Sequence, residues 1–281
     1  MDILVTLNSN YLKPLKIMLK SLFINHPDES FTIYLMHSSI SEAELADLAG
    51  YVSAEGNRLE VIGVDPDMFR DAPVVKHYSK EMYYRILAYR FLPDKLDKIL
   101  YLDPDLLVIN SIRELYDTDL TGYLYAAAYH DRVAVTEINK IRLMPYEIQA
   151  YYNTGVMLMN LALQREMIRE QDIFDFVEEN KFKLILPDQD IINALYSRYI
   201  KQIDEIRYNY DPRFYHYYKI LSNGKYDMDY IINHTSIIHF CGKRKPWHKK
   251  YRGLFYSLYK HYEKLACLQE EARKAEVQPQ V

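Results

Sequence analysis

The sequence lacks several features that mark common protein classes. None of its apolar runs approaches the roughly 18 residues that a membrane-spanning helix needs. Its two cysteines, Cys241 and Cys267, form neither a disulfide framework nor a zinc-ligand pattern, so we expect a protein of the reducing cytoplasm. Its eight glycines form no Walker loop and no G-x-G-x-x-G loop, which argues against a simple nucleotide-binding protein.

An excess of charge of one sign is also missing. The net charge of -4 gives no general attraction to nucleic acid, and we expect no nucleic-acid partner. Residues 1–5 lack the basic and apolar regions that begin a signal peptide. No stretch rich in proline, glycine or serine divides the chain, and its length is ample for one large core. We therefore expect one domain over residues 1–250 and a C-terminal helical appendage over residues 251–281.

Apolar runs and helical spacings alternate along the first half of the chain. Buried strands are predicted at residues 3–7, 31–35, 59–64 and 99–102. Helices are predicted between them, at about residues 15–23, 42–52 and 80–93, the second of which begins with a capping box. This order predicts an α/β fold with a central mixed, mostly parallel sheet flanked by helices. Ligands of such sheets bind beyond the carboxyl ends of the strands.

The second half is less regular. Strands are predicted at residues 124–129 and 155–159, and a helix at residues 166–180. Asp188, Gln189 and Asp190 follow Pro187 and precede an apolar spacing, so they begin a further helix. Carboxylates are stabilised at a helix N-terminus, and this cluster by itself indicates no more than a helix start.

Asp103-Pro104-Asp105 is the most informative motif. It lies between the apolar runs 99–102 and 106–109, which read as a buried strand and its continuation. Two carboxylates among buried residues need compensation, and a divalent cation takes carboxylate oxygens as ligands. Pro104 stiffens the turn, so both carboxylates can be presented to one point. The alternative is a surface loop, in which Asp and Pro are common.

A second informative stretch runs from residue 237 to residue 247. A predicted strand delivers His239, which is either a metal ligand or a hydrogen-bonded neighbour. The glycine-bearing turn that follows presents Lys243, Arg244 and Lys245, which bind phosphate or form a solvated loop. Both readings stay open from these residues alone.

Four motifs together resemble glycosyltransferase family 8, which includes bacterial lipopolysaccharide galactosyl- and glucosyltransferases and the glycogenins. They occur in the family's order and at family-like spacing between Asp2 and about Trp247. The motifs are Tyr101-Leu102-Asp103-Pro104-Asp105, Asn153-Thr154-Gly155-Val156, Asp188-Gln189-Asp190 and His239-x-x-Gly242-x-x-Lys245-Pro246-Trp247.

The resemblance implies a Rossmann-like GT-A fold and a retaining hexosyltransferase. Such an enzyme moves glucose or galactose from UDP-glucose or UDP-galactose to a glycan or lipid-linked acceptor, with Mn²⁺ or Mg²⁺. The metal ligands it implies are Asp103, Asp105 and His239. The contacts to uridine, ribose and diphosphate it implies are Thr6, Leu7, Asn8, Asn10, Tyr11, Asp103, Pro104, Asp105, Gly242 and Lys245. Around the donor hexose it implies Arg85, Asp131, Asn153, Asp188 and Gln189.

Some features leave alternatives open. Asn8 stands where family members often carry Asp, which loosens uracil or ribose recognition. A module that binds a UDP-sugar and metal without turnover, with a regulatory or structural role, is the alternative function. The basic and aromatic residues after Trp247 predict a helix that either packs on the core or makes a weak contact with a membrane surface, so a cytoplasmic protein peripheral at the membrane is expected. Residues 269–281 are polar and predicted to fray.

Overall fold

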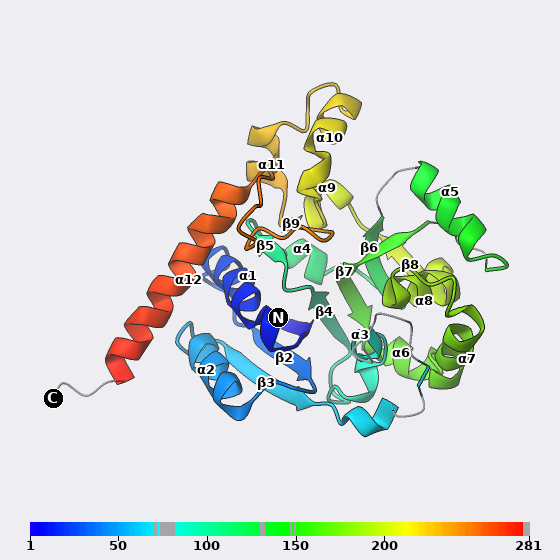
Figure 1. Ribbon diagram of the computed structural model, residues 1–281, viewed down its shortest axis with the longest axis horizontal. Coiled ribbons are helices and arrows are strands. Elements are labelled where there is room, and N and C mark those ends of the chain that lie inside the picture. Colours follow the sequence, from blue (N-terminus) through cyan, green and yellow to red (C-terminus); the bar gives the residue numbers. More distant parts are fainter. Residues whose placement is uncertain (70–71, 74–81, 130–132, 147, 149, 278–281) are drawn as a thin grey trace.

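The computed structural model describes residues 1–69, 72–73, 82–129, 133–146, 148 and 150–277. Within these residues the main sheet has seven strands in the order β3-β2-β1-β4-β7-β6-β8 (Figure 1). Its strands are β1 (Asp2–Thr6), β2 (Thr32–His37), β3 (Arg58–Gly63), β4 (Lys98–Leu102), β6 (Tyr125–Tyr129), β7 (Tyr152–Asn160) and β8 (Ile200–Gln202).

The sheet is mixed and mostly parallel, as predicted. The pairs β1–β2, β2–β3, β1–β4 and β6–β8 are parallel, whereas β7 is antiparallel to both of its neighbours. Successive residues of each central strand enter opposite cores. In β1, Ile3 and Val5 pack on one face, and Leu4 packs on the other. Both faces are therefore covered, which explains why the strands read as continuous apolar runs.

Helices lie on both faces of this sheet (Figure 1). One core includes residues of α1 (Leu12–Ile24), α2 (Glu42–Ser53) and α12 (Tyr256–Val277). The other core includes residues of α3 (Met82–Ile86), α6 (Leu161–Met167), α7 (Glu170–Asn180) and α8 (Pro187–Tyr196). The remaining helices are α4 (Arg113–Tyr116), α5 (Val133–Arg142), α9 (Glu205–Tyr208), α10 (Tyr215–Leu221) and α11 (Met228–His234). The capping box predicted for α2 is confirmed, with Ser41 and Glu44 bonded reciprocally.

Two helix predictions were wrong in extent. The helix expected over residues 80–93 is α3 followed by a short 3-10 turn, Ala88–Arg90. Residues 83, 84 and 86–89 are all buried. The segment therefore lacks the exposed polar face of the amphipathic helix that was predicted. The helix expected over residues 166–180 is divided, because Ile168 is extended and ends α6 before α7 begins. Residues 80 and 81 lie outside the described residues.

A second, two-stranded sheet begins shortly after β4. Its strands are β5 (Leu106–Val108) and β9 (Ile237–His239), which pair antiparallel with Leu106 opposite His239. The run expected to continue the strand after Asp103 therefore leaves the main sheet. This pairing places His239 beside Asp105, although the two are 134 positions apart in the sequence.

The C-terminal helix packs on the core. Tyr259 is 1% exposed, and α12 runs along α1 (Figure 1). The fraying expected from residue 269 is not seen up to Val277, because polar residues of the tail bind the body of the protein. Lys16 pairs with Glu270, and Arg273 pairs with Asp47. Residues 278–281 lie outside the described residues.

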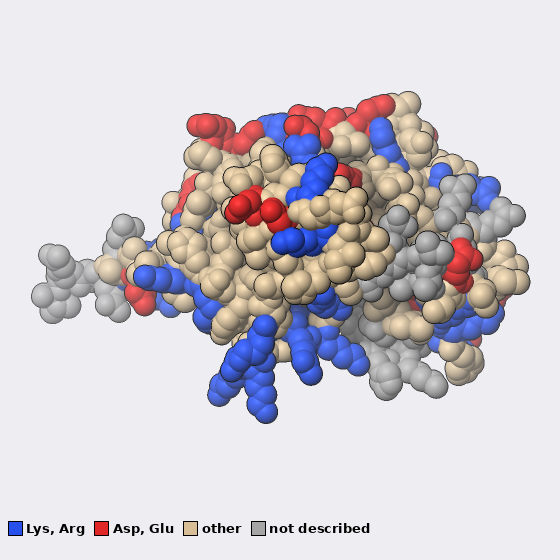
Figure 2. All heavy atoms as spheres, turned by 90° about the horizontal axis from the view of Figure 1, so that it is seen from above, with Lys and Arg blue, Asp and Glu red and all other residues tan. Residues whose placement is uncertain are grey.

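The surface carries separated groups of both signs. Figure 2 shows Asp and Glu side chains along one edge of the molecule and several Lys and Arg side chains protruding from the opposite edge. Acidic and basic side chains are therefore unevenly distributed over the surface, although the net charge is only -4. Among the described residues, no helix is both long and apolar enough to cross a lipid bilayer.

Candidate active site

The site begins at the carboxyl ends of β1 and β4. Asp103 directly follows β4, and its backbone N–H donates to the carbonyl of Gly155 over 2.8 Å. The hydroxyl of Tyr101 donates to Asp103 Oδ1 over 2.6 Å and lies 3.2 Å from Thr6 Oγ1. A buried hydroxyl therefore joins the two strand ends and fixes one carboxylate oxygen of Asp103.

Asp103, Asp105 and His239 converge on one point. One ligand atom from each can be chosen so that all three atoms lie within 4.8 Å of one another. His239 Nε2 lies 3.4 Å from Asp105 Oδ1 and 4.0 Å from Asp103 Oδ2. Two carboxylates and an imidazole suit Mn²⁺ or a similar divalent cation. The geometry therefore fits the metal site that the sequence predicts.

Cations surround the buried carboxylate of Asp105, which is 6% exposed. Lys245 Nζ donates to Asp105 and, over 2.9 Å, to the carbonyl of Phe240. Burial alone would raise the pKa of Asp105, but His239 and Lys245 hold it well below its usual range. Burial would likewise lower the pKa of His239, but Cys241 and Asp105 raise it well above its usual value. The protein thus concentrates positive charge around this acid.

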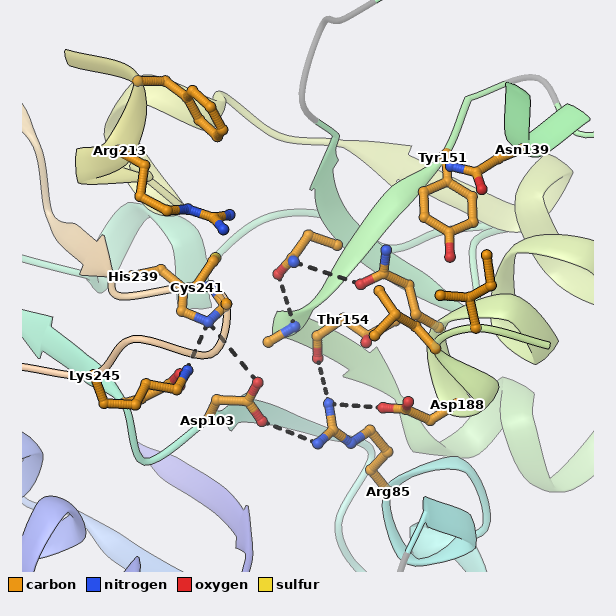
Figure 3. Close-up of a pocket in the computed structure, with 18 of the residues that line it drawn as sticks. Arg85, Asp103, Asn139, Tyr151, Thr154, Asp188, Arg213, His239, Cys241 and Lys245 are labelled. Atoms are coloured by element: carbon orange, nitrogen blue, oxygen red, sulfur yellow. Dashed lines mark hydrogen bonds and ion pairs between the residues drawn. The ribbon is translucent and has the colours of Figure 1, made fainter. Parts of the chain in front are cut away.

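Arg85 bridges two acids across the site (Figure 3). Its guanidinium lies 3.0 Å from Asp103 Oδ1 and 3.1 Å from Asp188 Oδ2, and it donates to the carbonyl of Thr154 over 3.2 Å. Its Cζ stands 4.5 Å from the ring centroid of Tyr101. Burial works against the charge of Arg85, but Asp103, Tyr101 and Asp188 raise its pKa above the usual value. Two acids, one backbone carbonyl and one aromatic ring thus hold this cation in one orientation.

Two cavities meet at these residues. The larger, of about 900 Å³, is lined by five predicted contacts of the UDP-sugar in and after the first strand, Thr6, Leu7, Asn8, Asn10 and Tyr11, together with Pro104. The smaller, of about 520 Å³, is lined by Asn153 and Gln189. Seven residues line both cavities: Arg85, Asp103, Asp105, Leu186, Asp188, Gly242 and Lys245. Every predicted site residue that the structure describes therefore lines one cavity or both. Asp131 lies outside the described residues.

Two buried polar residues that line neither cavity hold parts of the site in place. Asn209 is 0% exposed, and its Oδ1 lies 2.8 Å from His239 Nδ1. Asp190, from the Asp188-Gln189-Asp190 motif, does not reach either cavity but binds Arg142, Tyr151 and the backbone N–H groups of residues 185 and 186. It holds the segment that carries Leu186 against the site. Asp190 belongs to a motif identified in the sequence, but no local pattern marks Asn209, because its partners are remote in the sequence.

The comparisons with known proteins agree with this geometry. The sequence model described as Glycosyl transferase family 8 matches residues 2–251. The chain belongs to glycosyl transferase family 8. It is therefore a glycosyltransferase, and the resemblance read from its four motifs is confirmed.

Relatives of the family-8 chain are similar over most of its length. General stress protein A of Bacillus subtilis (strain 168) is 27% identical over 278 residues, which cover 93% of this chain and 92% of that protein. A lipopolysaccharide 1,2-glucosyltransferase of Escherichia coli is 26% identical over 251 residues, which cover 86% of this chain and 71% of that enzyme.

The solved structures include a close match in fold to this family-8 chain. The galactosyltransferase LgtC, crystallised in complex with donor and acceptor sugar analogs, matches with a TM-score of 0.79 at 27% identity, covering 94% of this chain and 96% of that one. LgtC has also been solved as an active-site mutant in which glutamine is replaced by glutamate. The match confirms the GT-A fold.

Proposed function

We propose that this chain is a retaining hexosyltransferase that moves glucose or galactose from a UDP-sugar to a hydroxyl of a glycan or lipid-linked acceptor, with a divalent cation. The observation that carries this proposal is the convergence of Asp103, Asp105 and His239 at the boundary of two cavities. The names of the relatives support it, because they include lipopolysaccharide glucosyl- and galactosyltransferases.

The larger cavity suits the nucleotide. Thr6, Asn8 and Asn10 line it and offer hydroxyl and amide groups for uracil and ribose. A cation held by the two aspartates and His239 would supply Lewis-acid charge to the departing diphosphate. Lys245 adds a positive charge at the same place. Gly242, with φ of 84°, allows a backbone conformation that other residues rarely adopt, so that the chain can approach the phosphates closely.

The smaller cavity suits the hexose and the acceptor. Asp188 and Gln189 lie at the start of α8, and Asn153 Nδ2 lies 3.5 Å from Gln189 Oε1. We assign Asp188 to the hexose hydroxyls and Gln189 to the region beneath the anomeric carbon, where LgtC's active-site glutamine offers a parallel. An amide is a poor nucleophile, which favours front-face attack over double displacement. The sugar-binding role expected of Asp131 stays a prediction.

Three further expectations stay predictions. They are the division of the chain at residue 250, the cytoplasmic location and the weak contact with a membrane surface. The family match ends at residue 251, close to the expected division.

The test of the proposed function is metal-dependent release of UDP. We expect UDP to be released from UDP-glucose or UDP-galactose in Mn²⁺, to stop in EDTA and to return when excess Mn²⁺ is added. The reason is that the leaving diphosphate needs the charge of the cation. Tight UDP binding without release from either donor would support the non-catalytic alternative. Release that is equally fast in EDTA would contradict the metal site.

Gly155 offers a test of the geometry itself. A Cβ at this position would lie 2.3 Å from His239 Cε1 and 2.7 Å from Asp103 Oδ2, so Gly155→Ala displaces two of the three proposed ligands. We expect the affinity for Mn²⁺, measured by titration calorimetry, to fall about 10- to 100-fold. Gly63→Ala is the matched control, because its Cβ meets no atom within 4 Å. Equal Mn²⁺ affinity of the two folded variants would contradict the assigned ligands.

A further inference from the structure

A buried amide stands behind the imidazole of His239. Asn209 Oδ1 lies 2.8 Å from His239 Nδ1, and the Asn209 side chain is fully buried. The backbone around Asn209 is fixed at both ends. Its own N–H donates to the carbonyl of Glu205, and the next residue, Tyr210, exchanges backbone hydrogen bonds with Ile237 and His239. The amide therefore has little freedom to move away from the ring.

The other end of this amide reaches the hexose side of the site. Asn209 Nδ2 donates to Asn153 Oδ1 over 3.0 Å, and the same oxygen accepts the backbone N–H of Gly155 over 3.0 Å. Asn153 Nδ2 in turn lies 3.5 Å from Gln189 Oε1. A chain of side-chain contacts thus runs from His239 through Asn209 and Asn153 to Gln189.

The hydrogen-bond roles in this chain follow from one backbone group. The N–H of Gly155 can only donate, so the atom of Asn153 that it meets is the carbonyl oxygen. That oxygen must also accept from Asn209, which therefore turns its NH₂ group toward Asn153 and its oxygen toward His239. His239 consequently donates from Nδ1. In the neutral ring that ligates a cation, this leaves Nε2, the nitrogen that faces Asp103 and Asp105, as the metal-binding atom.

We propose that Asn209 is a positioning residue with two functions. It holds the ring of His239 in the tautomer and orientation that direct Nε2 to a divalent cation, and it fixes the amide of Asn153 beside Gln189. This inference rests on the proposed function, because it assumes that His239 binds the metal. Partners of this kind, which bind the second nitrogen of a ligating histidine, tune metal affinity.

Two substitutions separate the two functions. Asn209→Ala removes both the acceptor for His239 and the donor for Asn153. Asn209→Asp keeps an acceptor for His239 but offers no donor, so only the contact with Asn153 is disturbed. Asn180→Ala is the matched control for loss of a buried amide. Asn180 is 5% exposed, donates to the carbonyl of Phe176 over 2.9 Å and lines neither cavity.

The primary measurement is Mn²⁺ affinity of the full chain by titration calorimetry, without sugar nucleotide. We expect Asn209→Ala to weaken binding about 10- to 100-fold and Asn209→Asp to stay within about threefold of the unsubstituted chain. Asn180→Ala is expected to bind Mn²⁺ normally, even if it unfolds at lower temperature. Unchanged Mn²⁺ affinity of folded Asn209→Ala overturns the proposal.

Two further readouts complete the test. In Mg²⁺, histidine-labelled protein should show a hydrogen-bonded His239 Nδ1–H resonance that disappears in Asn209→Ala and persists in Asn209→Asp. For the second function, Asn209→Asp should release UDP about tenfold more slowly at saturating Mn²⁺, and a rate equal to that of the unsubstituted chain overturns it. His239→Ala separates this inference from the proposed function. If that variant binds Mn²⁺ normally, the metal site itself is wrong, whereas weak binding by His239→Ala with normal binding by Asn209→Ala refutes only the role of Asn209.

Discussion

Asp105→Asn is expected to lower Mn²⁺-dependent UDP release by about a thousandfold. The substitution removes the charge of a buried acid that lies 3.4 Å from His239 Nε2, and it retains the shape of the side chain. An uncharged amide binds a divalent cation weakly, so the departing diphosphate loses its main source of compensating charge. The initial rate of UDP release at saturating donor and Mn²⁺ measures the effect.

Asp94→Asn is the matched control, because the Asp94 side chain is fully exposed and lies 3.9 Å from Arg165, outside both cavities. It should release UDP at the rate of the unsubstituted chain. A reduction of less than tenfold in Asp105→Asn would show that the carboxylate does not hold the metal.

The same substitution should also change the stability of the chain in EDTA. In the folded chain, Lys245 and His239 lower the pKa of Asp105, so its stabilising contribution is present above the pKa of an unfolded aspartate and is lost as pH falls through the lower folded value. At pH 7, Asp105→Asn leaves the partly buried ammonium of Lys245 without its carboxylate partner, at a cost of about 3 kcal/mol in the free energy of unfolding. Urea denaturation measures this cost, and adding Lys245→Met should recover part of it.

Arg85→Lys is expected to lower UDP release about 100-fold, although it keeps the charge. The guanidinium contacts Asp103, Asp188 and the carbonyl of Thr154 at once, and these lie in different directions. A single ammonium cannot keep all three contacts, so Asp188 is released from its position beside the proposed hexose. Comparison of kcat and KM for both UDP-sugars is the measurement.

Arg90→Lys is the control for Arg85, since Arg90 is nearby in the sequence but 42% exposed and paired with Glu170. Its kinetics should not change. Unaltered kcat and KM for Arg85→Lys would mean that the bridge between the two acids is not needed for transfer.

The site was predictable where the residues that form it belong to short local motifs. Asp103 and Asp105 stand out because carboxylates are unusual beside buried strands, and His239 follows an apolar run. What the motifs did not show is the pairing of β5 with β9, which brings these residues together. That pairing depends on contacts between residues far apart in the sequence, and the family resemblance implied only its result, that Asp103, Asp105 and His239 share a metal.

The positioning residues were not predictable, for a physical reason. Asn209 follows the short helix α9, in a segment with neither helical nor strand periodicity, and an asparagine there reads as an ordinary turn residue. Its significance depends on complete burial and on partners at His239 and Asn153. The tail was misjudged similarly, since polar residues such as Glu270 suggest solvent until their partners are seen.

β7 runs antiparallel to β4, and this pairing limits where the length of the chain can change. Leu102 lies opposite Val156, and this register sets which side of the sheet Asn153 and Gly155 face. Insertion or deletion of a single residue in this part of β7 would turn the side chain of Asn153 to the opposite face of the sheet. We therefore expect insertions and deletions in the connections between strands. Such changes can alter the part of the site that receives the acceptor and leave the residues proposed to bind the donor in place.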